Sequence, residues 1–244
     1  MLTFNNFFPP EVIAFVSDRK IDFSLNRNNP LLTDVQRKFL ASCLSFCKGA
    51  PEGKSFDLNN VCRLVQVHGQ RIILLRENHR FSQRTLEEAD GIVTNLNGFP
   101  LAVRTADCLP IFFYASTQKC IGLIHAGWRG TNQGIVKEAI KMMAAEYRVT
   151  ADEIKVSLGP AIRHCCYRVG KEIKDCFPGE TLQRGDNYYF DLPLANIHQL
   201  MAMGVREKNI FDCGVCTYCD INYFSYRREG DASGRMISFM MMRS

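Results

Sequence analysis

The sequence lacks the features that direct a chain to a membrane or to secretion. Its apolar end, Met236–Met242, is far shorter than the roughly 20 residues that cross a bilayer. Residues 1–10 carry no basic group ahead of an apolar stretch, so they do not resemble a signal peptide. The 11 cysteines are an odd number in a chain of 244 residues, which disfavours a disulfide framework. We therefore expect reduced thiols, a cytoplasmic location and no membrane partner.

The chain also lacks a strong excess of one charge. Its 30 Lys and Arg residues oppose 25 Asp and Glu residues, for a net charge of +5, and the basic residues are scattered. This balance disfavours a nucleic-acid partner but is compatible with an anionic small molecule. No repeat, low-complexity tract or proline-rich linker divides the sequence. We expect a single domain over residues 1–244 with a substantial core.

Strand patterns dominate the first half of the chain, and helices are interspersed later. Strands are predicted at 12–16, 61–67, 71–75, 91–94, 100–104, 110–115, 120–125, 154–158, 188–190 and 236–242. Helices are predicted at 33–48 (with Thr33 as N-cap and Gly49 as the stop), 131–148, 171–176 and 193–203. The simplest arrangement is an α/β (α+β) domain, in which helices pack outside a mixed β-sheet centre.

Three side chains that bind metals well lie at the ends of strand-like runs. His68 follows the run 61–67, Cys108 lies between two runs, and His125 ends the run 120–125. Two histidines and one cysteine are a known ligand set for catalytic zinc, with the fourth position left to water or substrate. A core cysteine and hydrogen-bonded histidines are the plainer interpretation of each residue alone. Their shared position at strand ends favours the metal site.

Neighbouring residues suggest a proton-handling group and an anion site. Asp107 could orient a ligand histidine or handle protons, although capping a turn is its plainer role. The stretch 127–132 leads into the predicted helix 131–148, so unpaired N–H groups and Arg129 form a candidate anion site. A plain strand-to-helix turn explains this stretch equally well. Arg227, beside an aromatic residue, fits a loop that contributes to the same site.

The cysteines Cys213, Cys216 and Cys219 have the C-x2-C-x2-C spacing of some iron–sulfur proteins. However, no fourth cysteine followed by proline completes the motif, and the nearest other thiol along the chain is Cys176. The spacing alone therefore disfavours a cluster at this place.

Several motifs along the chain resemble one known family. They are QVHG at 66–69, ADGIVT at 89–94, TADCLP at 105–110, HAGWRG at 125–130, Ser24-Leu25-Asn26, GPAI at 159–162, Cys166-Tyr167, Cys216-Thr217, FSYRR at 224–228 and Gly234-Arg235. Together they resemble the laccase-domain family, whose members are known as polyphenol oxidase, purine nucleoside phosphorylase or peptidoglycan editing factor. The resemblance spans nearly the whole chain. The laccase name fits poorly, because five histidines are too few for several copper centres.

The resemblance implies a fold, a metal and a reaction. The fold is related to a bacterial toxin cysteine-hydrolase fold, and zinc is held by His68, Cys108 and His125. The implied reactions are phosphorolysis of adenosine, inosine, guanosine and methylthioadenosine, with adenosine deamination as a second activity. Purine nucleosides and phosphate are then the partners. The expected catalytic residues are Cys108, Asp107 and His125, and the expected substrate- or phosphate-binding residues are Arg129, Arg227, Asn26 and Gln66.

Two other functions remain open at this point. In the first, Cys108 is a nucleophile with His125 as its base, in a cysteine hydrolase or amidase that acts on a peptidoglycan precursor. In the second, the chain is a non-enzymatic protein that binds a metal or a nucleoside. Metal content distinguishes the cysteine hydrolase from a zinc enzyme, because a thiolate held by zinc is not free to attack. Turnover of inosine with phosphate distinguishes an enzyme from the non-enzymatic binding protein.

Overall fold

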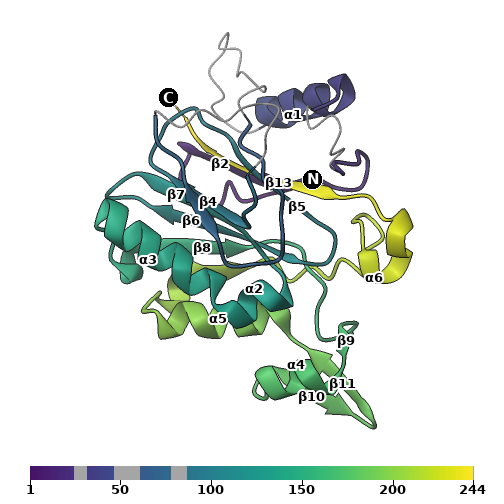
Figure 1. Cartoon of the computed structure of the whole chain (residues 1–244). Helices are drawn as coiled ribbons and strands as arrows, with labels where there is room; N and C mark the ends of the chain where they lie inside the picture. The colour runs from purple at the N-terminus through teal and green to yellow at the C-terminus, as the bar shows by residue number, and fades with distance from the viewer. Residues whose placement is uncertain (25–31, 47–60, 78–86, 244) are drawn as a thin grey trace.

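The computed structural model describes residues 1–24, 32–46, 61–77 and 87–243 (Figure 1). Two β-sheets pack face to face at its centre, with one cluster of buried side chains between them. Helix α1 (Asp34–Phe46) covers the outer face of one sheet. Helices α2 (Trp128–Gln133), α3 (Ile135–Tyr147) and α5 (Leu192–Ala202) cover the outer face of the other.

The first sheet has four antiparallel strands in the order β1-β2-β13-β5. These are β1 (Leu2–Thr3), β2 (Val12–Val16), β13 (Met236–Met242) and β5 (Leu101–Thr105). Every residue of β13 is buried, because α1 packs on one side of this sheet and the second sheet packs on the other. The apolar C-terminal run is therefore a core strand, as predicted.

The second sheet has six strands in the order β12-β8-β6-β7-β4-β3. They are β12 (Ile210–Asp212), β8 (Ile154–Leu158), β6 (Leu109–Ala115), β7 (Cys120–Ala126), β4 (Gly91–Thr94) and β3 (Ile72–Leu74). The β12–β8 and β3–β4 pairs are parallel and the other pairs are antiparallel, so the sheet is mixed. This confirms the expected fold class, with two stacked sheets at the centre.

The central strands are apolar along their whole length because both faces of the sheet are covered. On β6, Phe112 and Tyr114 point between the two sheets, whereas Ile111 and Phe113 point towards the helices. Successive side chains of a strand point to opposite faces, so both sets are buried at once. This packing fixes the strand ends at which the candidate site lies.

A small subdomain projects from this body (Figure 1). It contains β9 (Arg168–Val169), α4 (Lys171–Cys176), β10 (Thr181–Arg184) and β11 (Asn187–Phe190), with strand order β10-β11-β9. Phe177 and Phe190 stack with ring centroids 4.7 Å apart at its base. Helix α6 (Tyr226–Glu229) lies near the end of the chain. Short 3-10 turns span Ala151–Glu153, Glu207–Asn209 and Gly230–Ala232.

The predicted helix 131–148 is wrong in one respect, because two helices occupy this region. Gly134 has φ of +85°, a left-handed conformation that ends α2 and begins α3. Most of the candidate anion stretch 127–132 therefore lies in the short helix α2, and its backbone does not form the N-terminus of the longer helix α3. The start of helix α1 agrees with its prediction, since Thr33 Oγ1 accepts from Gln36 N. Its predicted end at Lys48 and Gly49 lies outside the described residues.

The predicted strand 61–67 is also wrong. In this segment only Cys62 and Val65 form bridges, to Leu101 and Glu88, and no continuous ladder develops. Cys62 thus pairs with β5 at one edge of the first sheet, whereas the partner of Val65 lies outside the named strands. By contrast, helix α5 agrees with its prediction to within one residue at each end, with Pro193 in its first turn and Gly204 just beyond its end at φ +94°.

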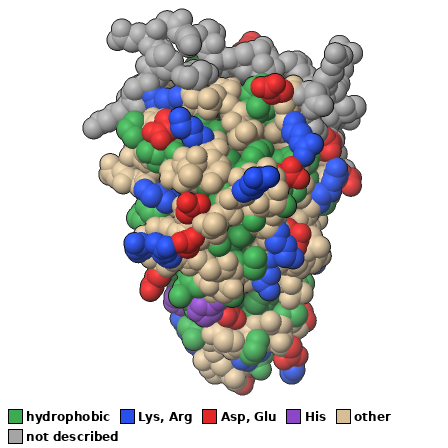
Figure 2. All heavy atoms as spheres, turned by 90° about the vertical axis from the view of Figure 1, so that its left-hand side faces the viewer, with side chains coloured by type: hydrophobic (Ala, Val, Ile, Leu, Met, Phe, Trp, Pro, Cys, Tyr) green, Lys and Arg blue, Asp and Glu red, His purple; other side chains and the backbone are tan. Residues whose placement is uncertain are grey.

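The surface has no region of one charge on the face that Figure 2 shows, because Lys, Arg, Asp and Glu side chains alternate across it. None of the helices in the described part of the chain is long and apolar enough to cross a membrane.

Candidate metal centre and its cavity

His68, Cys108 and His125 meet at one end of the six-stranded sheet. His125 lies opposite Pro110 in the β6–β7 register, so Cys108, two residues before Pro110, reaches the same strand end. The metal-binding atoms of all three residues lie within 4.8 Å of one another. The two imidazole rings are edge to face, with centroids 4.8 Å apart. The structure thus brings together the three residues that the sequence predicts.

Unusual backbone conformations position these ligands. His68 has φ of +59° and Asp107, next to Cys108, has φ of +86°, both in the left-handed region. Such conformations cost free energy in residues other than glycine and cluster at functional sites. Gly127 allows the close approach, because a Cβ atom there would lie 3.1 Å from Cys108 Sγ and 3.2 Å from His68 Cδ2.

Asp90 holds two of the three ligands in place. Its carboxylate accepts hydrogen bonds from the backbone N–H groups of Val67, His68 and Gly69, at 3.2, 3.0 and 2.7 Å. The same carboxylate lies 2.8 Å from Nδ1 of His125. Because Nδ1 is engaged, His125 has Nε2 available for a metal. Asp90, one residue before β4, therefore does what Asp107 was expected to do for a ligand histidine.

The two histidines, Cys108 and Asp90 shift the pKa values of Cys108 and His125. Burial alone would raise the pKa of the Cys108 thiol, but His125 and His68 outweigh burial and lower this pKa to about 6. Burial alone would lower the pKa of His125, but the Cys108 thiolate and Asp90 raise it to about 9. Cys108 is therefore a thiolate at neutral pH even without a metal.

The donor set fits zinc. A thiolate and two imidazoles are borderline-soft ligands, and Asp90 orients one imidazole as carboxylates commonly do beside zinc. All three ligands line a cavity of about 640 Å³, so a fourth coordination position would face that cavity. Such an open site is typical of catalytic zinc.

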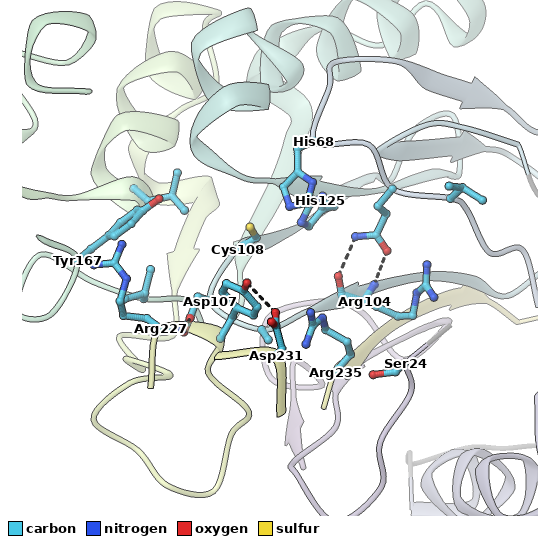
Figure 3. A pocket seen from close by; sticks show the side chains of 16 residues that line it. Ser24, His68, Arg104, Asp107, Cys108, His125, Tyr167, Arg227, Asp231 and Arg235 are labelled. Carbon is cyan, nitrogen blue, oxygen red and sulfur yellow. Dashed lines mark hydrogen bonds between the residues drawn. The ribbon is translucent and has the colours of Figure 1, made fainter. Parts of the chain in front are cut away.

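The cavity combines this centre with charged and aromatic groups (Figure 3). Tyr167 and Arg227 lie on one side, and Arg104 and Arg235 lie on the other. The remaining lining residues are Ser24, Val65, Gln66, Ala106, Asp107, Ile162, Leu192, Tyr226 and Asp231. A cavity of a few hundred cubic ångströms on which polar and charged groups converge is typical of a small-molecule site.

Arg104 and Arg235 make one side of the cavity electropositive. Burial, then Arg63 and Arg235, lower the pKa of Arg104 to about 10. Gln66 fixes the backbone of Arg104, donating to its carbonyl at 2.7 Å and accepting from its N–H at 2.8 Å. Guanidinium groups that repel one another are stabilised by an anion bound between them. This side of the cavity is therefore suited to an anion.

Asp107 forms part of the cavity wall. Its carboxylate accepts from Thr217 Oγ1 and from the backbone N–H of Arg227, each at 2.6 Å. The Arg227 guanidinium donates to the carbonyl of Arg168 at 2.6 Å and lies 5.1 Å from the ring centroid of Tyr167. Arg227 lies in the short helix α6 and not in the loop that the sequence predicts. Asp107 thus joins the metal centre to this helix.

Two predicted binding residues lie elsewhere. Arg129 is exposed and stacks on Trp128 at 4.5 Å, and it is not among the residues that line the cavity. Asn26 lies outside the described residues. The sequence did not reveal the roles of Asp90, Arg104 and Arg235, although all three lie in or beside the family motifs. Their signal was a charged residue at the end of an apolar strand run.

Metal-free protein should show unusual reactivity at Cys108. Since its pKa is lowered from 9.0 to about 6, the thiolate should persist as the pH falls and be lost only near pH 6. We expect alkylation by iodoacetamide after chelation to have a midpoint near pH 6, measured by peptide mass spectrometry. Added zinc should protect the thiol. A midpoint near 9, as for an ordinary thiol, would contradict this electrostatic description.

The fold and the site define a class: a mixed α/β protein with an open two-histidine, one-cysteine centre at its strand ends. The chain belongs to the family described as multi-copper polyphenol oxidoreductase laccase, whose model matches residues 51–243. This confirms the resemblance seen in the sequence.

Relatives and solved structures agree with this assignment. A purine nucleoside phosphorylase from Clostridium acetobutylicum is 33% identical over 192 residues, covering 77% of this chain and 79% of that protein. An adenosine deaminase from an unidentified prokaryote is 33% identical over 194 residues, covering 73% and 74%. The crystal structure of a hypothetical protein from Bacillus licheniformis has a TM-score of 0.82 at 26% identity, covering 96% and 93%.

Proposed function

We propose that this chain is a zinc-dependent purine nucleoside phosphorylase for adenosine, inosine, guanosine and methylthioadenosine, with adenosine deaminase activity. The observation that carries the proposal is the centre of His68, Cys108 and His125, which opens into a cavity lined by three arginines. Relatives named for both activities support it. We propose the cytoplasm as its location and residues 1–244 as one domain.

The protonation and orientation of the metal ligands suit the proposed zinc chemistry. Zinc, when bound, supplies a water of pKa about 7, which is the nucleophile that deamination needs. Cys108 binds as a thiolate, and His125 is held by Asp90 so that Nε2 is available. Asp107, fixed by Thr217, is our proposed proton-handling group in the cavity wall.

The arginines are the proposed phosphate site. In phosphorolysis, a phosphate oxygen bonds to ribose C1′ while the C1′–N bond breaks and the purine leaves with the electron pair and gains a proton. Arg104 and Arg235 on one side of the cavity, with Arg227 on the other, can hold that phosphate by charge-assisted hydrogen bonds. Arg129 stays a proposed contributor at the outer edge. Gln66 would act through Arg104, whose backbone it fixes.

Product analysis tests the proposal. Purified protein incubated with inosine should release hypoxanthine only when phosphate is present, and the sugar product should be ribose 1-phosphate, detected by ³¹P NMR. The reason is that the arginines proposed to bind phosphate line the same cavity as the metal centre, so one cavity can hold both reactants. Adenosine should yield inosine without phosphate. Release of free ribose would instead make the protein a hydrolase.

Conservative arginine variants should separate the two activities. Arg235→Lys and Arg227→Lys should each raise the KM for phosphate by about tenfold, because lysine cannot form the same paired hydrogen bonds. Deamination uses no phosphate and should change much less, and the zinc content should stay intact. Arg184→Lys, a change in an exposed residue of strand β10 outside the cavity lining, is the matched comparison. Equal losses of both activities would assign these arginines to nucleoside binding.

A cysteine hydrolase or amidase acting on a peptidoglycan precursor is the second candidate, since the Cys108 thiolate lies against His125. In that case zinc would inhibit turnover, whereas the proposed phosphorylase requires it. If no phosphorolysis appears with zinc bound and no hydrolysis appears after chelation, a non-enzymatic metal- or nucleoside-binding role is favoured.

A further inference from the structure

Four cysteines from two distant segments meet outside the centre described above. Cys165 and Cys166 lie in the turn before β9, and Cys216 and Cys219 lie in the turn after β12. All four sulfur atoms lie within 4.8 Å of one another. The sulfur of Cys219 is 3.8 Å from that of Cys165 and 3.2 Å from that of Cys166. All four are free thiols, because a disulfide bond measures about 2.05 Å.

We propose that Cys165, Cys166, Cys216 and Cys219 form a second zinc site with a structural role. Four thiolates around one ion are typical of closed structural zinc sites, with metal–sulfur bonds of about 2.3 Å. A tetrahedron of that size places its sulfurs about 3.8 Å apart. The observed separations include 3.2 and 3.8 Å and do not exceed 4.8 Å, so small side-chain shifts would bring all four sulfurs to an ion. No position is left open for water or substrate, so the site would brace the fold and take no part in the chemistry. The inference does not rest on the proposed function.

The local backbone supports a metal-binding turn. Cys216 and Cys219 are separated by two residues, and the backbone N–H of Asp220 donates to the carbonyl of Cys216 at 2.9 Å. This hydrogen bond closes the turn, so that both sulfurs of the pair are carried by one short, fixed segment. A pair of cysteines two residues apart in a turn is a common half of a zinc site.

Backbone pairing holds the two segments in register. Ala161 N donates to the carbonyl of Val215 at 3.3 Å, and Thr217 N donates to the carbonyl of Ala161 at 3.1 Å. Arg163 forms an ion pair with Asp212 beside this bridge. The cysteine pairs are thus positioned by contacts that do not involve their own sulfurs. This preorganisation favours metal binding over chance proximity of exposed thiols.

The structure also revises the spacing pattern seen in the sequence. Cys213 is not part of the group, and its side chain packs against the core between the two sheets. Cys216 and Cys219 instead find their partners in Cys165 and Cys166. The motif lacked a fourth cysteine only because the missing ligands lie on another segment.

The site would brace the wall of the cavity. Tyr167, which lines the cavity, directly follows Cys166. Thr217, which directly follows Cys216, donates to Asp107 at 2.6 Å. Arg228 adds hydrogen bonds to the carbonyls of Thr217 and Tyr218, at 2.7 and 2.8 Å. An ion shared by the two turns would keep Tyr167 and Asp107 at a fixed separation.

Zinc stoichiometry of protein purified under reducing conditions tests the proposal. Wild-type protein should hold about two zinc ions per chain, Cys108→Ala and Cys219→Ser about one each, and the double variant about none. Cys176→Ser, which changes an exposed thiol outside both groups, should keep about two. Wild-type content in Cys219→Ser would overturn the site. So would a single wild-type zinc that disappears in Cys108→Ala.

Spectroscopy identifies the ligands without depending on how the Cys219 variant folds. In Cys108→Ala protein, X-ray absorption at the zinc edge should show about four sulfur neighbours at about 2.3 Å and no imidazole scattering. Cobalt in the same protein should give the intense visible bands of a tetrahedral thiolate site. Imidazole signals, bound iron in place of zinc, or a Cys166–Cys219 disulfide with no second metal would each contradict the proposal.

Loss of the second zinc should also lower stability. We expect the thermal midpoint of Cys219→Ser to fall by about 5 °C relative to Cys176→Ser in the presence of zinc. A chelator should remove this difference, because both proteins then lack the ion. A difference that persists in chelator would assign it to the lost thiol itself and would contradict bracing by the metal.

Discussion

Cys108→Ala should lose the zinc of the centre and at least about 100-fold of both phosphorolysis and deamination. A three-ligand site cannot retain its ion well without the thiolate, which is the ligand that carries a negative charge to offset the charge of the ion. Both activities fall together because the proposed mechanism places them at one centre. Zinc content by elemental analysis and turnover of inosine and adenosine are the measurements.

Cys120→Ala is a control that removes a thiol from the same sheet. Cys120 is fully buried in β7, its pKa is raised by burial to about 12, and it belongs to neither group of metal-binding cysteines. It should lose some stability through the small cavity but keep its zinc and both activities. Equal zinc content and equal activity in Cys108→Ala and wild type would refute the ligand assignment.

Asp90→Asn should weaken zinc binding about 10- to 100-fold and lower the free energy of unfolding by about 2–4 kcal/mol. The fully buried carboxylate accepts three backbone hydrogen bonds and contacts His125, and an amide cannot accept them all. Zinc affinity by competition with a chelator and unfolding in urea are the measurements. Asp231→Asn is the control. It makes the same substitution at an exposed carboxylate that lines the cavity and hydrogen-bonds to Tyr226, and it should leave zinc binding unchanged.

The stability effect of Asp90 should depend on pH. Burial alone would raise its pKa, but His125 and the N–H groups of Gly69 and His68 outweigh burial and lower it below 3.8. A lowered folded-state pKa stabilises the protein above the unfolded-state value, and this stabilisation disappears as the pH falls through the folded-state value. The difference between wild type and Asp90→Asn should therefore be full above about pH 4 and shrink below it. A constant difference through that range would contradict the role of the carboxylate charge.

The sequence predicted the elements whose pattern is local and missed those that depend on tertiary contacts. Strands β6 and β7 are long apolar runs with turn residues between them, so both they and the ligands at their ends could be located. The helix break at Gly134 was missed because an isolated glycine inside an apolar periodicity is compatible with either outcome.

The site was predicted in part for the same reason. His68, Cys108 and His125 share a local signature, a metal-binding residue at the end of an apolar run. Asp90 and Arg235 act from other segments, and only the folded chain shows that they reach the cavity or its ligands. The partnership of Cys216 with Cys165 depends on pairing between segments far apart in the sequence, which no spacing rule encodes.

Removal and restoration of zinc test the central claim most directly. Protein stripped by a chelator should not convert inosine and phosphate, and zinc alone should restore the release of hypoxanthine with ribose 1-phosphate. The reason is that His68, Cys108 and His125 form the open centre beside the cavity. Full phosphorolysis by the metal-free protein, or release of free ribose after zinc is restored, would contradict the account.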